Sequence, residues 1–145
     1  MTQTISVDHL LLSVPQMDEE HQALISQANE YSAAVEARAS RAELILRLTL
    51  LIEAFQVHFD SEEGLMQSNR FPGLAPHADE HRKLIEQMTA LRDCVGAGDV
   101  QICDALAVFM RVWTEQHIEG LDRSFARFLG EGKAPGATGL LSIGQ

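Results

Sequence analysis

Apolar residues recur every three or four positions between Ser40 and Leu65, and this repeat constrains the fold more than any other feature. The repeating positions are Leu44, Leu48, Leu51, Phe55, His58, Glu62 and Leu65. Residues three and four apart lie on one face of an α-helix, so the pattern predicts an amphipathic helix. Ser40 followed by Glu43 is a capping box and predicts where this helix begins. His58 and Glu62 stand where apolar residues are expected, and an ionised glutamate is costly to bury without a partner.

Three other stretches carry the same period, so we expect an all-α, up-down-up-down four-helix bundle. Their inward positions are His21, Leu24, Ile25, Ala28, Tyr31, Ser32 and Val35; His77, His81, Leu84, Met88, Leu91 and Val95; and Ile102, Leu106, Phe109, Met110, Trp113 and His117. Asp18 is expected to cap the first of these helices, and Pro76 to open the next. After the break at residues 96–98, Asp99 is expected to cap the last helix.

Length and charge bound the domain organisation and the partners. The 145 residues suit one domain, which we place at residues 1–130 with an N-terminal arm over residues 1–16. A loosely attached, glycine-rich C-terminal tail is expected to follow over residues 131–145. The net charge of −10 argues against nucleic acid as a partner. Neither a basic leader nor a membrane-length apolar run is visible, so we expect no membrane insertion and a cytoplasmic location, with both cysteines reduced.

One irregularity interrupts the last helical pattern. The acidic residue Asp122 lies five positions after His117, and in a regular α-helix five residues turn the chain by roughly 140° away from the shared face. Counted from Asp122, the apolar pattern resumes at Phe125 and Leu129. One reading is a π-bulge with Gly120 inside it, of the kind often found at functional sites. The other is a regular helix in which Asp122 points away.

Five of the six histidines and two carboxylates fall at one end of the expected bundle. They are His21, His58, Glu62, His77, His81, His117 and Asp122. Seven donors are too many for one zinc ion, but they suit two six-coordinate transition metals with one open position for a small diatomic ligand. The sixth histidine, His9, stands in no useful spacing, and we expect it to be structural.

These spacings resemble a known family. H-x3-E, H-x3-H and H-x4-D, preceded by D-x-x-H, are similar to the ligand pattern of the hemerythrins over roughly residues 5–130. The resemblance implies two bridged iron ions that bind O2 reversibly for transport, storage or delivery, with no catalytic residue. It makes Glu62 and Asp122 the bridging ligands. It assigns His77, His81 and His117 to the saturated iron, and His21 and His58 to the iron with the open position. Any enzyme that consumes the oxygen stays unknown.

The same resemblance assigns an oxygen pocket, and two of its features depart from the family pattern. The pocket residues are Leu24, Phe59, Trp113, Thr114 and Ile118. The family usually has leucine where this chain has Thr114, whose hydroxyl could bond oxygen or admit water. We therefore expect faster autoxidation than in a Thr114→Leu variant. The family often has tyrosine where Phe125 stands, and its usual tryptophan is missing from the N-terminal arm.

Other readings of the same residues fit less well or differ in role. A ferritin-like di-iron oxidase uses Glu-x-x-His pairs and four carboxylates, which this chain lacks. A metal-free bundle would bury several polar groups unsatisfied. Oxygen or redox sensing, or removal of nitric oxide or peroxide at the same di-iron centre, stays open as an alternative. The donor types alone also allow other metals, such as manganese.

Overall fold

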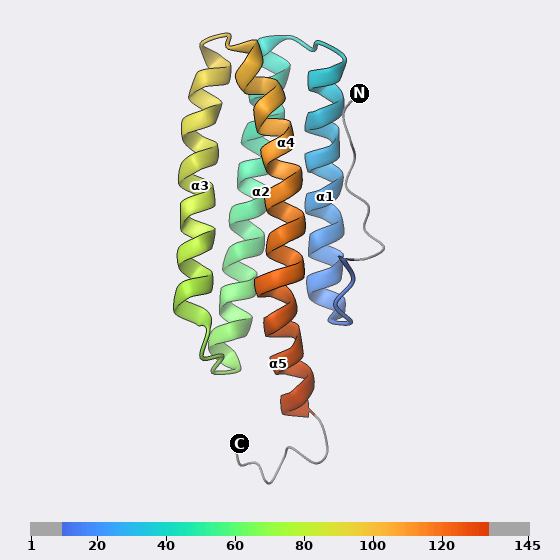
Figure 1. Ribbon diagram of the computed structural model, residues 1–145, viewed down its shortest axis with the longest axis vertical. Coiled ribbons are helices and arrows are strands. Elements are labelled where there is room, and N and C mark those ends of the chain that lie inside the picture. The colour runs from blue at the N-terminus through green and yellow to red at the C-terminus, as the bar shows by residue number, and fades with distance from the viewer. Residues whose placement is uncertain (1–9, 134–145) are drawn as a thin grey trace.

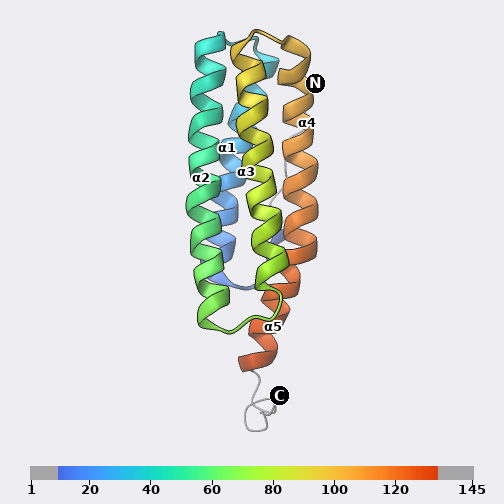
Figure 2. The same ribbon diagram turned by 90° about the vertical axis from the view of Figure 1, so that its left-hand side faces the viewer.

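The computed structural model describes residues 10–133, and this part of the chain is a bundle of four antiparallel helices (Figure 1). The helices are α1 (Pro15–Glu36), α2 (Arg41–Ser68), α3 (Leu74–Gly96) and α4 (Val100–His117), and a short π-helix (Ile118–Asp122) joins α4 to α5 (Arg123–Lys133). Consecutive helices pack side by side, and α4 closes the bundle against α1 and α3 (Figures 1 and 2). The prediction of an all-α, up-down-up-down bundle is confirmed.

Two of the four helix starts agree with the sequence patterns. Ser40 precedes α2, and its hydroxyl accepts the backbone N–H of Glu43 at 3.1 Å. Asp99 precedes α4, and its carboxylate accepts the backbone N–H of Ile102 at 3.1 Å. Both side chains satisfy a donor that the first turn of a helix leaves without a partner.

The other two starts lie earlier than expected. Helix α1 begins at Pro15, and Asp18 lies within its first turn. The Asp18 carboxylate accepts the backbone N–H groups of Leu12 at 2.8 Å and Ser13 at 3.1 Å, so it fastens the preceding arm to the helix instead of capping it. Helix α3 begins at Leu74, two residues before Pro76. The expectation that Asp18 and Pro76 mark helix starts was therefore wrong.

Three helices end in the same backbone motif, with one residue in the left-handed region. That residue is Arg38 after α1 (φ 57°), Arg70 after α2 (φ 55°) and Gly98 after α3 (φ 90°). In each case the next residue donates its N–H to a carbonyl five positions back: Ala39 to Ala34, Phe71 to Met66 and Asp99 to Cys94. These bonds define the Schellman motif, which satisfies the last carbonyl groups of each helix.

The core follows the predicted stripes, with small differences in three helices. On α4 the buried positions include Cys103, Ala107 and Thr114, whereas Phe109 and Trp113 are only partly buried. On α2, Met66 is buried where Leu65 was expected, and Leu65 packs at its edge. Leu91 and Ile102, also predicted inward, are likewise partly buried. The inward face of α4 is therefore turned toward Cys103, Ala107 and Thr114 and away from its two large aromatic residues.

Helix α5 extends beyond the expected start of the tail. It continues to Lys133, so the first three residues of the expected tail, 131–133, are helical. Phe71, in the loop between α2 and α3, packs against Phe125 and Phe128 of α5, with ring centroids 4.9 and 5.1 Å apart. Residues 1–9, including His9, and residues 134–145 lie outside the described part. No helix within residues 10–133 combines the length and apolar character needed to cross a bilayer.

Candidate metal centre

The turn between α4 and α5 contains one extra residue. Residues Ile118–Asp122 form a π-helix, and Gly120 lies inside it as the sequence slip predicted. The side chains of His117 and Asp122 are both buried, at 4% and 0% exposure, although they are five residues apart. Leu121, which a regular helix would turn inward, is only partly buried. The π-bulge therefore brings Asp122 to the same face as His117.

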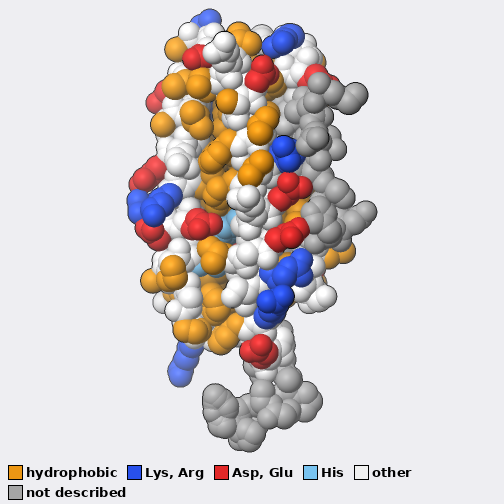
Figure 3. All heavy atoms as spheres, viewed as in Figure 1, with side chains coloured by type: hydrophobic (Ala, Val, Ile, Leu, Met, Phe, Trp, Pro, Cys, Tyr) orange, Lys and Arg blue, Asp and Glu red, His pale blue; other side chains and the backbone are white. Residues whose placement is uncertain are grey.

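The structure brings together all seven side chains predicted to bind metal. They are His21 from α1, His58 and Glu62 from α2, His77 and His81 from α3, His117 from α4 and Asp122 from the π-helix. Each is at most 4% exposed. Only small areas of histidine reach the surface on the face seen in Figure 3, between apolar side chains. Their ligand atoms form two overlapping groups, with all atoms in each group within 4.8 Å of one another.

Glu62 lies between two sets of imidazoles. Its Oε1 is 3.0 Å from Nε2 of His77 and 3.2 Å from Nε2 of His81. Its Oε2 is 3.3 Å from Nε2 of His58 and 3.7 Å from Nε2 of His21. One carboxylate therefore presents a different oxygen to each set.

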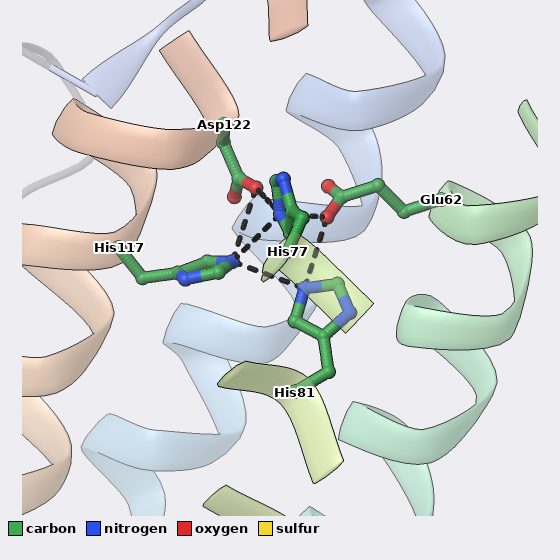
Figure 4. Close-up of side chains that lie close together, drawn as sticks. All are labelled: Glu62, His77, His81, His117 and Asp122. Carbon is green, nitrogen blue, oxygen red and sulfur yellow. Dashed lines mark hydrogen bonds and ion pairs between the residues drawn. The ribbon is translucent and has the colours of Figure 1, made fainter. Parts of the chain in front are cut away.

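Asp122 repeats this arrangement from the opposite side. Its Oδ1 is 2.9 Å from Nε2 of His77 and 3.1 Å from Nε2 of His117, and its Oδ2 is 3.0 Å from Nε2 of His21. We call His77, His81 and His117 the three-histidine group, and His21 and His58 the two-histidine group. Figure 4 shows the three-histidine group converging with both carboxylates.

The chemistry of these donors fits metal cations. Within residues 10–133, none of the four oxygens of Glu62 and Asp122 has a partner in hydrogen-bond geometry, although both carboxylates are buried. A buried anion without compensation costs several kcal/mol. All five imidazoles direct Nε2 toward these oxygens, and neutral imidazole nitrogen and carboxylate oxygen are the donors that transition metals bind. Metal ions between them would supply the missing positive charge.

Without metal, protons take part of that role. Burial disfavours the imidazolium form of His21 and His77, but Asp122 and Glu62 outweigh burial and raise the pKa of both histidines to about 9. Burial lowers the pKa of His117, but Asp122 and Glu80 together outweigh burial, so this pKa is also raised. Burial acts to raise the pKa of Glu62 and Asp122, but the surrounding imidazoles hold both pKa values below their usual range. The metal-free centre therefore keeps its carboxylates ionised.

The expected oxygen-pocket residues are buried or partly buried, but they divide between two places. The ring of Phe59 stacks on His81 at a centroid distance of 3.7 Å, and Trp113 stacks on His117 at 4.4 Å. These two rings therefore cover the three-histidine group. Leu24 instead borders, with His58 of the two-histidine group, a surface cavity of about 320 Å³ between α1 and α2. The two remaining residues, Thr114 and Ile118, are 2% and 3% exposed.

Three glutamates that the sequence analysis missed contact the outer nitrogens of the histidines. His58 Nδ1 lies 2.6 Å from Glu20, His81 Nδ1 lies 2.8 Å from Glu63, and His117 Nδ1 lies 3.0 Å from Glu80. Each glutamate directly precedes or follows a predicted ligand in the sequence, and this adjacency was the available signal. A carboxylate on the outer nitrogen of a histidine fixes the ring orientation and leaves the inner nitrogen free to bind metal.

Fold and site together define a class of protein, the metal-binding four-helix bundles with a histidine- and carboxylate-lined core. Comparison with known families makes the assignment specific. A family model described as the hemerythrin HHE cation binding domain matches residues 12–129, so the chain belongs to the hemerythrin family. This agrees with the resemblance seen in the sequence.

Individual relatives agree with this assignment. A bacteriohemerythrin of Methylococcus capsulatus is 29% identical over 108 residues, which cover 74% of this chain and 82% of the relative. A myohemerythrin of Sipunculus nudus is 29% identical over 76 residues, or 52% of this chain and 58% of the relative. The crystal structure of a mutant hemerythrin has a TM-score of 0.77 at 26% identity and covers 88% of this chain and 97% of its own. The chain is thus a hemerythrin-family cation-binding domain whose buried cluster is consistent with a di-iron site.

Proposed function

We propose that this chain binds dioxygen reversibly at a centre of two iron ions and acts in oxygen transport, storage or delivery. The observation that carries the proposal is the position of Glu62 and Asp122. Each turns one oxygen to the three-histidine group and the other toward the two-histidine group. Carboxylates held in this way suit two metal ions better than one, because each oxygen meets a different set of imidazoles.

In this proposal each histidine group binds one iron ion, and Glu62 and Asp122 are shared. Iron is supported by the nitrogen-rich donors, which suit it, and by membership of the hemerythrin family. The two-histidine group supplies one imidazole fewer, which makes it the better place for an exogenous ligand. When bound, the iron pair supplies the electrons and the open coordination position for reversible oxygen binding. We propose no catalytic residue.

The surrounding apolar residues protect such a centre from water. Leu24 and Ile118 are at most 4% exposed, and the ring of Phe59 is 1% exposed. The planar contacts of Phe59 with His81 and of Trp113 with His117 also restrict the rotation of those imidazoles. A dry and rigid surrounding limits proton access to the oxygen site and so favours release of the ligand unchanged.

The direct test is the absorption spectrum of the protein loaded with iron(II) under nitrogen, recorded before and after exposure to air. We expect a visible band that appears with oxygen and disappears when oxygen is removed. Analysis of metal content accompanies the spectra, and we expect two iron ions per chain. A protein that binds two irons but oxidises at once, without a reversible band, contradicts the carrier role.

One observation favours a second candidate function, which is oxygen or redox sensing, or removal of nitric oxide or peroxide, at the same centre. The hydroxyl of Thr114 is buried beside the metal-binding end of α4 and has no hydrogen-bond partner in the described part of the chain. A free donor in this region can stabilise a polar ligand or an ordered water, and either would favour oxidation over simple release. Immediate formation of ferric iron in air supports this second function.

Substitution of Thr114 by leucine tests the balance between these two functions. Removing the hydroxyl and filling its space with apolar atoms should slow autoxidation of the iron-loaded protein. One hydrogen bond is worth on the order of 1 kcal/mol, so we expect an effect of roughly fivefold. The rate is followed as loss of the oxygenated spectrum in air. An equal or slower rate in the native protein contradicts the assigned role of Thr114.

A further inference from the structure

Three glutamates outside the predicted ligand set form a regular series around the bundle. Glu20 on α1 reaches His58 on α2, Glu63 on α2 reaches His81 on α3, and Glu80 on α3 reaches His117 on α4. Every contact joins a glutamate oxygen to Nδ1, and every one of these imidazoles directs Nε2 toward Glu62 or Asp122. In all three contacts the outer nitrogen of the imidazole therefore meets a glutamate, and the inner nitrogen faces the bridging carboxylates.

The series follows one sequence rule. Each glutamate stands next to a predicted ligand on its own helix: Glu20 beside His21, Glu63 beside Glu62, and Glu80 beside His81. Neighbouring residues on a helix point about 100° apart. When the ligand points into the core, its neighbour therefore points toward the seam with the next helix. Each of α1, α2 and α3 thus supplies a ligand to the centre and a carboxylate to a ligand of the helix that follows.

The fourth contact, from α4 back to α1, is missing. The ligand of α4, His117, is flanked by Gln116 and Ile118, and Asp122 of the π-helix is flanked by Leu121 and Arg123. None of these four neighbours carries a carboxylate. Nδ1 of His21 is buried and has no hydrogen-bond partner among the described residues. Nδ1 of His77 likewise has no hydrogen-bond partner among the described residues. His81 on the same helix does have one, because its Nδ1 contacts Glu63. The three-histidine group thus has two held imidazoles, and the two-histidine group has only His58.

Glu20 is itself held more firmly than the other two glutamates. Its Oε1 faces His58, while its Oε2 accepts the hydroxyl of Ser61 at 3.0 Å and the side-chain amide of Gln16 at 3.3 Å. Gln16 also donates to the Ser61 hydroxyl at 2.9 Å. Support on the two-histidine side is therefore concentrated in this one carboxylate.

We propose that Glu20, Glu63 and Glu80 are positioning residues of the metal centre, and that the missing fourth contact makes the metal of the two-histidine group the first to be released. The proposal rests on the di-iron centre proposed above. Glu20 acts on the two-histidine metal, through His58. Glu63 and Glu80 act on the three-histidine metal, through His81 and His117.

The test measures release of iron(II) to an excess of a chromogenic chelator under nitrogen, in the full-length protein loaded with two equivalents. For the parent we expect two phases of one equivalent each. Glu20→Ala should accelerate the fast phase, and Glu63→Ala and Glu80→Ala the slow phase, each by about 10- to 100-fold. Glu19→Ala and Glu53→Ala are matched controls, because both side chains are exposed on the same helices as two of the positioning residues. Both controls should release iron like the parent.

The glutamine variants separate positioning from a general effect of charge or folding. Glutamine keeps an oxygen that accepts the imidazole N–H, so Glu20→Gln should release iron more slowly than Glu20→Ala. The helix content of each metal-free variant, measured by circular dichroism, should equal that of the parent, because the three glutamates are partly exposed.

Three outcomes overturn the inference: a single release phase in the parent, alanine variants that behave like the controls, or loss of helix content that accounts for the faster release. Failure of the parent to bind two equivalents would instead contradict the proposed function itself.

Discussion

The hydroxyl of Thr114 on α4 differs from that of Thr89, a threonine within α3. Thr89 donates to the carbonyl oxygen of Ile85 at 2.8 Å, which is the common bond of a threonine within a helix. Thr114 makes no such bond, although it is 2% exposed. Its hydroxyl is therefore free to bond a water or ligand molecule. Until such a molecule binds, the buried and unpaired hydroxyl lowers the stability of the fold.

This contrast leads to a prediction for the metal-free protein. Thr114→Val removes a buried, unpaired hydroxyl at nearly constant shape, so the free energy of unfolding should rise by about 1 kcal/mol. Thr89→Val is the matched control and should lower it by about 0.5–1.5 kcal/mol, because that hydroxyl has a partner. Urea unfolding of both variants measures the effects. A loss of stability in Thr114→Val would mean that the hydroxyl already has a partner.

At the scale of the elements, three helices end with a residue in the left-handed region, and only one of these residues is glycine. Gly98 adopts φ 90° after α3, and a Cβ atom there would lie 2.7 Å from Nη2 of Arg41. Arg38 and Arg70 occupy the equivalent positions after α1 and α2 with positive φ. The left-handed conformation costs a residue with a side chain roughly 1–2 kcal/mol. Two of the three helix ends therefore carry strain that glycine would relieve.

Substitutions at these ends should have opposite signs. Gly98→Ala should lower the free energy of unfolding by about 1–2 kcal/mol through the left-handed conformation alone. Arg38→Gly should raise it by up to about 1 kcal/mol, since relief of strain exceeds the added freedom of the unfolded chain. Chemical denaturation measures both, with the exposed Arg38→Ala as a control that keeps the strain. A destabilised Arg38→Gly variant would show that the arginine side chain contributes more than its backbone strain costs.

The features that could be predicted from the sequence are those whose pattern of residues lies within a single helix. The bundle followed from apolar periodicity. The shift between His117 and Asp122 left two readings open, and the structure shows the π-bulge. Asp18 was misassigned because its partners, the N–H groups of Leu12 and Ser13, belong to an arm without periodicity. Glu20, Glu63 and Glu80 were missed because each acts on a different helix. Such contacts depend on the rotation of neighbouring helices, which periodicity alone does not define.

At the scale of the whole molecule, the buried charges couple folding to pH. In the metal-free protein the pKa of His21 and His77 is about 9, against 6.5 for an unperturbed histidine. A raised pKa in the folded state stabilises the fold fully below pH 6.5, and this stabilisation is lost as the pH rises toward 9. Metal ions bind the neutral imidazoles, so they displace these protons and gain affinity over the same range.

We therefore expect the two forms of the protein to respond differently to pH. Between pH 6.5 and 9 the metal-free protein should lose stability on the order of a few kcal/mol. The metal-loaded protein should show little change or a gain. Unfolding by urea at several pH values, with and without metal, measures both trends. A metal-free protein whose stability does not fall over this range would show that the two imidazoles are neutral when folded.

The extra residue in the π-helix also sets the register of everything that follows it. Phe125, with 0% exposure, and Leu129, with 6%, continue the inward face from Asp122 and not from His117. Deletion of Gly120 would leave Asp122 four positions after His117, and a regular α-helix with that spacing returns the carboxylate to within about 40° of the same face. Phe125 and Leu129 would keep their inward face, and the aromatic contacts of α5 with Phe71 would be preserved in the same step. The π-helix thus accommodates one inserted residue. The metal ligand and the packing of α5 therefore keep their positions together, whether that residue is present as a bulge or removed with it.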